Sequence, residues 1–363
     1  MLSAGNGFIM QSEKYSRDNA GQSLKKYILL KKGELAYNHG ASKAKQYGCC
    51  YELTEDEARI PYVYHCFKVS GAEHTPYVAT ALNNPKIDRQ LKRLVSSSVR
   101  MDGLLNISFD DYMSVILHLP SLKEQTHIAD FLKKLDERIT AQEKLVASLK
   151  KYKRGLLNAF FAEKSDYFLF SDASALKIEE VCDVLSGKRI PKGETFCSHP
   201  TEYRYITVSD MGEKYVCSDN LQYISEHTEK QISRYKVKGG DIIISVAGTL
   251  GKLNIITSDL GGVNLTENCD RFTNFRGVGS EYLYYVLSSD LIQSQIESSK
   301  TKNGQPKLAL ERIRNFTIPV PHQEIQEQLV KVMISLDQYI ASQLAILDRY
   351  CKLRSGLLQQ LFI

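Results

Sequence analysis

The chain has 363 residues, of which 43% are hydrophobic and 25% charged, and its 47 basic and 42 acidic side chains give a formal net charge of +5. This length and composition are typical of a soluble protein with two or three domains. No run of about 18 apolar residues predicts a membrane span, and no signal peptide is evident. The eight cysteines form no C-x-x-C pair, so we expect reduced cysteines, no metal site and no cofactor.

The first 118 residues are expected to form a mixed α/β domain. Its segment Leu30–Ala36 aligns with Val237–Ile243 in the second half of the chain. Counted back from this match, Met1 corresponds to about Val208. The first domain would then lack a counterpart of residues 176–207, so we expect it to be incomplete at its N-terminus.

A long repeat follows this domain. Residues 119–161 recur 201 positions later as residues 320–362, with 11 of 43 aligned positions identical. A repeat of this kind outranks other fold signals. Each copy is preceded by a segment, residues 114–120 and 315–321, that is expected to be a short strand stopped by proline.

Within each copy, apolar residues at steps of three and four with charged residues between them predict a coiled-coil helix. The predicted seam comprises Phe131, Leu135, Ile139, Gln142, Leu145, Leu149, Tyr152 and Leu156, and in the second copy Val332, Leu336, Ile340, Gln343, Ile346, Tyr350, Leu353 and Leu357. A helix of about 38 residues spans roughly 55–60 Å. It is too long to bury its seam against one small domain, so we expect the two copies to pair. Gln142 and Gln343 either fix the register of the pair or stay hydrated at its edge.

The second domain is also expected to be mixed. Residues 176–185 predict a short helix that leads to the loop Gly187–Lys192. Residues 203–208 and 241–246 predict strands, and residues 282–296 have helical spacing. The fold class is therefore α+β, with two mixed domains and two long antiparallel helices, and with expected boundaries at residues 1–118, 119–164, 165–318 and 319–363.

This order of elements resembles the specificity subunit of type I restriction–modification systems. The matching motifs are Lys238–Ser245 with Gly248-Thr249-x-Gly251, Ile318–Pro321 with Glu324–Gln326, and Gly356–Phe362, with first-half equivalents at Leu119–Pro120, Lys123–Gln125 and Gly155–Leu157. The resemblance covers nearly the whole chain. It implies that each domain reads one half of a bipartite double-stranded DNA target while the helix pair holds the domains apart. It also implies a cytoplasmic complex with two modification (methyltransferase) subunits and with restriction (translocase–nuclease) subunits.

The resemblance further implies that the chain does no chemistry itself, and the motifs agree. Residues 247–253 lack the spacing of a phosphate-binding loop, because Val246 replaces its first glycine and Leu253 its magnesium-binding Ser or Thr. Residues 83–86 are expected to form a turn rather than a methyltransferase loop. The main alternative is a truncated, stand-alone DNA-binding or regulatory remnant. A catalytic fusion is disfavoured because no segment is left to form a catalytic domain.

Candidate DNA contacts are donors and acceptors on loops, together with cations for phosphates. In the second domain they are Lys188, Arg189 and Lys192 in the Gly187–Lys192 loop, Lys252 in the glycine turn, and Lys300, Lys302, Asn303, Gln305 and Lys307 before the proline-ended strand. In the first domain they are Lys43, Lys45 and Arg100. The alternative for each is a solvated surface charge.

Overall fold

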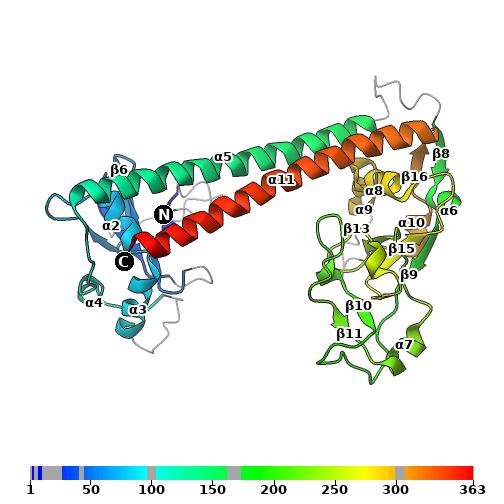
Figure 1. Ribbon diagram of the computed structural model, residues 1–363, viewed down its shortest axis with the longest axis horizontal. Helices are drawn as coiled ribbons and strands as arrows, with labels where there is room; N and C mark the ends of the chain where they lie inside the picture. The colour runs from blue at the N-terminus through cyan, green and yellow to red at the C-terminus, as the bar shows by residue number, and fades with distance from the viewer. Residues whose placement is uncertain are drawn as a thin grey trace. The chain divides into compact units, whose positions relative to one another are not determined.

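The computed structural model describes residues 2–3, 7–9, 27–40, 45–95, 104–161, 173–298 and 307–362 (Figure 1). The chain is α+β and divides into two compact units. Unit 1 contains Met1–Leu145 and Gln343–Ile363, and unit 2 contains Val146–Ser342. No helix in the described segments is long and apolar enough to cross a membrane. The domain boundaries expected from the sequence stay predictions, because this division falls within the long helices.

Two long helices run through both units. They are α5 (Leu122–Phe160) and α11 (Gln323–Leu361), each 39 residues long. Their first and last residues are 201 positions apart, so the repeat in the sequence is a repeat of whole helices. Each unit thus contains the start of one long helix and the end of the other.

Within unit 1 the two helices are antiparallel, and polar contacts join them. The guanidinium Nη2 of Arg354 donates to the carboxylate of Asp136 at 3.0 Å. The amide Nε2 of Gln142 donates to the backbone oxygen of Gln343 at 3.0 Å and to its side-chain oxygen at 2.9 Å. Gln142 is buried, so it is not a hydrated edge residue. In unit 2 the repeat-equivalent ion pair joins Lys153 to Asp337.

The seam lies partly where the sequence places it. Among the expected seam residues, Leu135, Gln142 and Ile340 are buried. The partly buried ones are Ile139, Leu149, Leu156, Leu336, Gln343, Ile346, Tyr350 and Leu357. The expectation was wrong for Phe131, Leu145 and Tyr152, which are 50%, 39% and 60% exposed, and for Val332 and Leu353. In α5 the neighbours Leu132 and Val146 are buried in place of Phe131 and Leu145. Alternating steps of three and four keep 132, 135, 139, 142, 146 and 149 on one face of the helix, whereas the step from 142 to 145 leaves that face.

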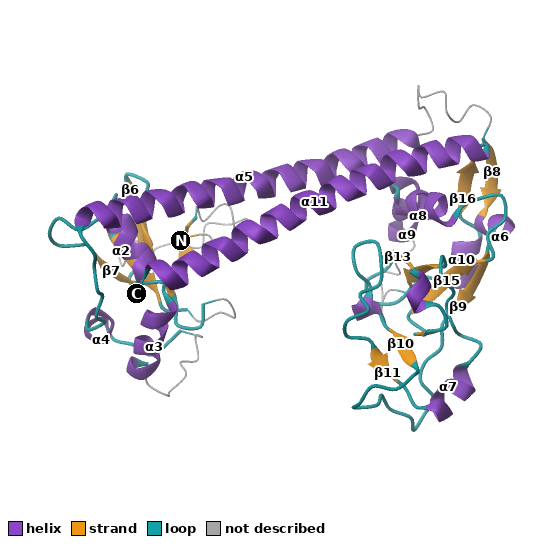
Figure 2. Ribbon diagram, viewed as in Figure 1, coloured by secondary structure: helices purple, strands orange, loops and turns teal. Residues whose placement is uncertain are grey.

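The domain of unit 1 contains small sheets and short helices (Figure 2). In one sheet, β4 (Leu35–Asn38) lies between β5 (Cys49–Glu52) and β7 (His65–Phe67); in another, β3 (Tyr27–Lys31) pairs with β6 (Glu57–Pro61), and β1 (Leu2–Ser3) pairs with β2 (Gly7–Phe8) separately. The described helices of the domain are α2 (Thr75–Ala81), α3 (Pro85–Leu94) and α4 (Phe109–Met113). Leu35, Tyr37 and Leu91 are almost fully buried in its core.

The domain of unit 2 has three sheets. The largest has the strand order β13 (Leu253–Ile255), β12 (Ile242–Ser245), β15 (Cys269–Thr273), β9 (Asp183–Ser186); the second is β11 (Gln222–Tyr223), β10 (Arg204–Ile206), β14 (Asn264–Leu265); the third pairs β16 (Thr317–Val320) with β8 (Ser174–Lys177). Its helices are α6 (Ile178–Val181), α7 (Glu226–Ile232), α8 (Ser280–Ser288), α9 (Asp290–Ser298) and α10 (Leu310–Arg314), with short 3₁₀ turns at Val208–Asp210 and Ser258–Leu260. The main core joins the largest sheet and α8 to the ends of the long helices in this unit.

The repeat extends into the domains. Gly33 and Gly240 both have a positive φ, 82° and 87°, which a residue without a Cβ adopts without strain. The turns around them carry the same contact: the amide of Lys31 donates to the carboxylate of Glu34 at 2.8 Å, and in unit 2 the amide of Lys238 donates to the carboxylate of Asp241 at 2.8 Å. The alignment of the two segments in the sequence therefore reflects one turn built twice.

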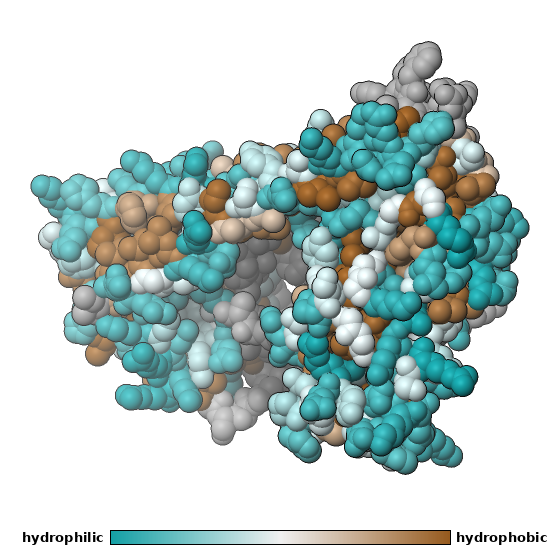
Figure 3. Space-filling model, turned by 45° about the vertical axis from the view of Figure 1, so that its right-hand side comes forward, coloured by the Kyte–Doolittle hydropathy of each residue, from teal (hydrophilic) through white to brown (hydrophobic). Residues whose placement is uncertain are grey.

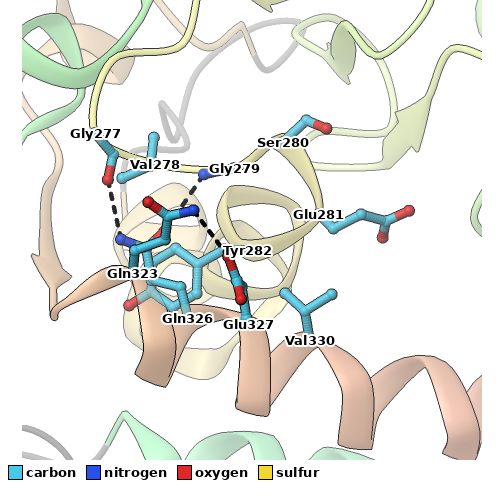
Figure 4. Close-up of a pocket in the computed structure, with 10 residues that line it drawn as sticks. All are labelled: Gly277, Val278, Gly279, Ser280, Glu281, Tyr282, Gln323, Gln326, Glu327 and Val330. Atoms are coloured by element: carbon cyan, nitrogen blue, oxygen red, sulfur yellow. Dashed lines mark hydrogen bonds between the residues drawn. The ribbon is translucent and has the colours of Figure 1, made fainter.

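A buried glutamine at the start of each long helix ties that helix to its domain. In unit 2 the side-chain oxygen of Gln326 accepts from the amide of Gly279 at 3.3 Å, and its Nε2 donates to the backbone oxygen of Gly277 at 3.0 Å (Figure 4). The same Nε2 donates to the backbone oxygen of Pro321 at 3.0 Å. In unit 1, Gln125 accepts from the amide of His74 at 3.0 Å. Its Nε2 also donates to the oxygen of Pro120 at 2.9 Å. The two amides that bind the glutamines, those of His74 and Gly279, belong to the N-cap residues of α2 and α8. These two helices therefore hold equivalent positions in the two units and begin 205 residues apart.

Several expectations for single elements need correction. Residues 176–185 are not one helix, because β8 and β9 flank the short α6 and pair with β16 and β15. Residues 315–321 contain β16, but residues 114–120 form no strand, since no described strand of unit 1 pairs with them. The helical stretch 282–296 is two helices, α8 and α9, separated at Ser289.

Candidate nucleic-acid interface

The loop that follows β9 lies against the ends of two other strands of unit 2. The amide of Gly187 donates to the oxygen of Cys269 at 3.0 Å, and the amide of Lys188 donates to the oxygen of Leu265 at 2.8 Å. A Cβ on Gly187 would lie 2.0 Å from the backbone oxygen of Thr266. The loop therefore approaches the chain so closely that this position requires glycine.

Strands β10 and β14 are parallel neighbours, with Tyr205 opposite Asn264. Their carboxyl ends leave the sheet at the same edge, as in sheets that bind ligands beyond the ends of their strands. There the loop and the two strand ends surround an open hollow of about 420 Å³. It is lined by Arg189, Ile190, Phe196, Thr207, Val208, Ser209, Thr266, Glu267 and Asn268.

The side chains around this hollow combine hydroxyl and amide groups with cations. The hydroxyls of Thr207 and Ser209 lie 2.7 Å apart. The guanidinium of Arg189 contacts the carboxylate of Glu267 at 2.7 Å while its side chain stays 78% exposed. Burial by itself would raise the pKa of Glu267, but the hydrogen bonds from Arg189, from its own backbone amide and from Thr266, together with the charge of Arg189, bring the pKa below its ordinary value. The carboxylate is thus kept charged and orients Arg189 at the rim.

The other predicted cations of this loop are solvent-exposed. Lys188 places its ammonium 5.8 Å from the centre of the Tyr235 ring, and Lys192 is exposed. Flexible, hydrated ammonium groups of this kind suit phosphate contacts. On the face shown in Figure 3 the surface is mostly hydrophilic, with hydrophobic residues in separate patches.

Lys252 and Lys307 lie elsewhere in unit 2. The ammonium of Lys252 donates to the backbone oxygen of Met211, and this contact joins the glycine turn to the chain around Met211. Residues 247–253 therefore form a tight turn between β12 and β13, as expected, with Gly248 and Gly251 at positive φ. Lys307 is exposed and forms a β-bridge with Ala247.

Six of the predicted DNA contacts cannot be placed. Lys43, Arg100, Lys300, Lys302, Asn303 and Gln305 lie outside the described residues. In unit 1, Lys45 is partly buried, and its charge lowers the pKa of Cys49 and Asp88 against the larger effect of burial, which raises them. Of the predicted contacts that the structure describes, Arg189 lines the hollow, and Lys188 and Lys192 lie on the same loop.

Sequence reasoning missed the polar residues at the strand ends. Thr207, Ser209, Thr266 and Asn268 are single Thr, Ser and Asn residues with no motif spacing. The available signal was their position directly after the apolar ends of β10 and β14, at Ile206 and Leu265. Their convergence depends on the parallel pairing of these strands, which are about 60 residues apart in the sequence.

Part of the chain matches a known protein family. Residues 171–348 match the family described as type I restriction modification DNA specificity domain. The type I restriction enzyme MjaVIII specificity subunit of Methanocaldococcus jannaschii is 23% identical over 261 residues, which are 68% of this chain and 61% of the relative. The EcoBI specificity subunit of Escherichia coli is 23% identical over 316 residues, 81% of this chain and 62% of the relative. The chain thus spans about three-fifths of the length of these curated relatives.

Solved structures share the fold. A chain from a study of the assembly and conformational transition of a type I restriction–modification system has a TM-score of 0.61 at 17% identity, covering 92% of this chain and 82% of that one. The S subunit of the type I system from M. genitalium has a TM-score of 0.56 at 18% identity, covering 93% and 85%. In its second half by the family match, and in its doubled helix-and-domain order, the chain is thus similar to the specificity subunits of type I restriction–modification systems.

Proposed function

We propose that this chain is the DNA sequence-recognition subunit of a type I restriction–modification complex, which reads a bipartite target and directs methyltransferase and restriction subunits to it. The observation that carries the proposal is the convergence of hydroxyl, amide and cationic side chains at the carboxyl ends of β10 and β14. These groups can donate to and accept from base edges, while Lys188 and Lys192 can contact phosphates.

The chain contributes recognition rather than catalysis in this proposal. The methyl transfer and DNA cleavage belong to the partner subunits, which act in the cytoplasm. Two modification subunits fit the doubled architecture, because each unit offers one domain with the start of one long helix and the end of the other.

Mapping the methylated bases of a host genome tests the proposal. Co-expression of the chain with its cognate modification subunits is expected to give one two-part methylation motif. The double variant Ser209→Ala/Asn268→Ala should relax or change one part of the motif only, since a lost bidentate contact costs about 1–3 kcal/mol of discrimination. The control Lys134→Gln, at an exposed position of α5, should leave both parts unchanged. An absence of any motif with the wild-type chain would refute the proposal.

A further inference from the structure

We infer that the exposed face of α3 in unit 1 binds the phosphate backbone of DNA. This face, which we call the α3 basic face, consists of Lys86, Arg89, Lys92 and Arg93. The inference rests on the proposed function and adds a contact surface on the first domain. It concerns a helix that is separate from the loop site of unit 2.

The four cations lie on one side of the helix. At about 100° per residue they occupy an arc of roughly 120°, opposite Ile87 and Leu91, which are 4% and 1% exposed. From the first cation to the last, the helix rises about 10 Å. The buried stripe therefore fixes the helix in the core and turns the α3 basic face to solvent.

The start of α3 is also fixed. Asn84, at the position where the sequence predicts a turn, is the N-cap of the helix, and its side-chain oxygen accepts from the amide of Lys86 at 2.9 Å. Its Nδ2 donates to the backbone oxygen of Leu358 in α11 at 2.8 Å. The α3 basic face is thus carried by a helix that is anchored to the end of a long helix in the same unit.

None of the four cations forms an ion pair with another residue in the described part of the chain. The acidic residue of α3, Asp88, lies at the flank of the arc and is partly buried. All four cationic side chains are exposed. Four like charges within eight residues repel one another and lower the stability of the helix. A bound anion would relieve this repulsion.

The fold itself does not need these charges. The equivalent helix of unit 2, 205 residues later, is α9, whose Ile292 and Ile296 are buried where α3 has Ile87 and Leu91. At the positions of the four cations, α9 has Leu291, Ser294, Glu297 and Ser298. The two helices thus share the buried stripe and differ on the outer face, where α3 is basic.

DNA phosphates fit this face better than a protein surface does. Phosphates follow one another every 3.4 Å along the axis on one strand, so a 10 Å stripe of cations reaches two or three of them. Stable protein interfaces are built around large apolar or aromatic anchors, and the arc of α3 occupied by the four cations holds no such side chain, only Pro85 at the first position of the helix. Its contacts with DNA would be independent of base sequence.

The test compares two variants of the full chain by binding to duplex DNA in fluorescence anisotropy, with KCl varied. The variant K86Q/R89Q/K92Q/R93Q removes the α3 basic face, and the control K123Q/K134Q/K144Q/K151Q removes four exposed charges from α5. Each lost phosphate contact lowers the salt slope of log K by about 0.9. We expect the α3 variant to lose about 2–3 from the slope and to bind all sequences more weakly by a similar factor, whereas the control keeps most of the wild-type slope.

Equal losses of slope in both variants would overturn the inference, because they would reflect net charge alone. So would wild-type DNA binding by the α3 variant, and loss of its co-purification with the modification subunits in that case would assign the face to a protein partner. If the wild-type chain together with its modification subunits binds no DNA at all, the proposed function itself is wrong. Circular dichroism of both variants verifies that the exposed substitutions leave the helix content intact.

Discussion

Replacement of Lys214 by methionine is expected to loosen the attachment of the domain of unit 2 to its helix segments. The ammonium of Lys214 lies 2.9 Å from the carboxylate of Glu281 on α8 and 3.4 Å from that of Asp337 on α11. It also donates to the hydroxyl of Tyr285 at 2.8 Å, and the side chain is only 13% exposed. Methionine keeps much of the length of the side chain but removes the charge and all three contacts.

The magnitude follows from how far the partners are buried. Removing one member of a fully buried ion pair costs about 3–5 kcal/mol. Glu281 and Asp337 keep 31% and 21% of their side chains exposed, and Asp337 retains its contact with Lys153. About half of the full effect, roughly 2 kcal/mol, is therefore expected. The lost attraction of the ammonium to surrounding tyrosine rings, 4.8 Å away in the case of Tyr285, adds about 0.5 kcal/mol.

The chain contains no tryptophan whose fluorescence could report unfolding, so hydrogen exchange measured by mass spectrometry is the suitable assay. A loss of about 2 kcal/mol lowers the protection of α8 amides roughly 30-fold if they exchange by detachment of the domain. The control is Lys150→Met, which removes an exposed ion pair with Glu213 and should cost less than about 1 kcal/mol. Equal protection of α8 in the two variants would refute the reasoning from burial.

Three further outcomes are expected. Asp270 is buried, and burial raises its pKa. A carboxyl group with a raised pKa in the folded state destabilises the fold as pH rises, so Asp270→Asn should be more stable than wild type at pH 7 in thermal unfolding, by a difference that shrinks toward pH 4. A difference in stability that does not depend on pH would contradict this. Gln142→Leu removes the hydrogen bond that the side-chain oxygen of Gln343 accepts and should cost about 1–3 kcal/mol. Leucine at both positions should restore most of this loss in urea unfolding followed by circular dichroism, and additive losses would disprove the coupling. Gly187→Ala should weaken DNA binding at least about ten-fold, because a Cβ at this position would lie 2.0 Å from a backbone oxygen. Gly155 in α5 has open space around it, so Gly155→Ala should instead raise the free energy of unfolding by about 1 kcal/mol.

The long helices could be predicted because they are long, amphipathic and repeated. Their seam could be predicted only in part, since Leu145 and Val146 are both apolar and only the alternation of three- and four-residue steps separates them. Gln125 and Gln326 stood out as identities in the repeat, but their role did not. It depends on the backbone of α2 and α8, which a sequence pattern on the long helix does not contain.

The candidate site was predictable to the same limited degree. Glycine and proline mark the Gly187–Lys192 loop, and its cations are plain in the sequence. Lys252 donates to a backbone oxygen 41 residues away, and a pattern of side chains in the sequence cannot predict a backbone acceptor. The pairing of β10 with β14 likewise brings Thr207 and Asn268 to one hollow. The local sequence of either strand does not predict which strand it pairs with.

The contact between Gln142 and Gln343 has a consequence for the origin of the chain. These two residues are the same position in two copies of one segment, and they bind each other. When a helix pairs antiparallel with its own copy, one position meets itself, as in the interface of a symmetric dimer. A glutamine carries both the donor and the acceptor that such a meeting needs. Duplication of a single gene segment is therefore sufficient to create both sides of this hydrogen bond, and the register of the helix pair requires no later matching of two unrelated sequences.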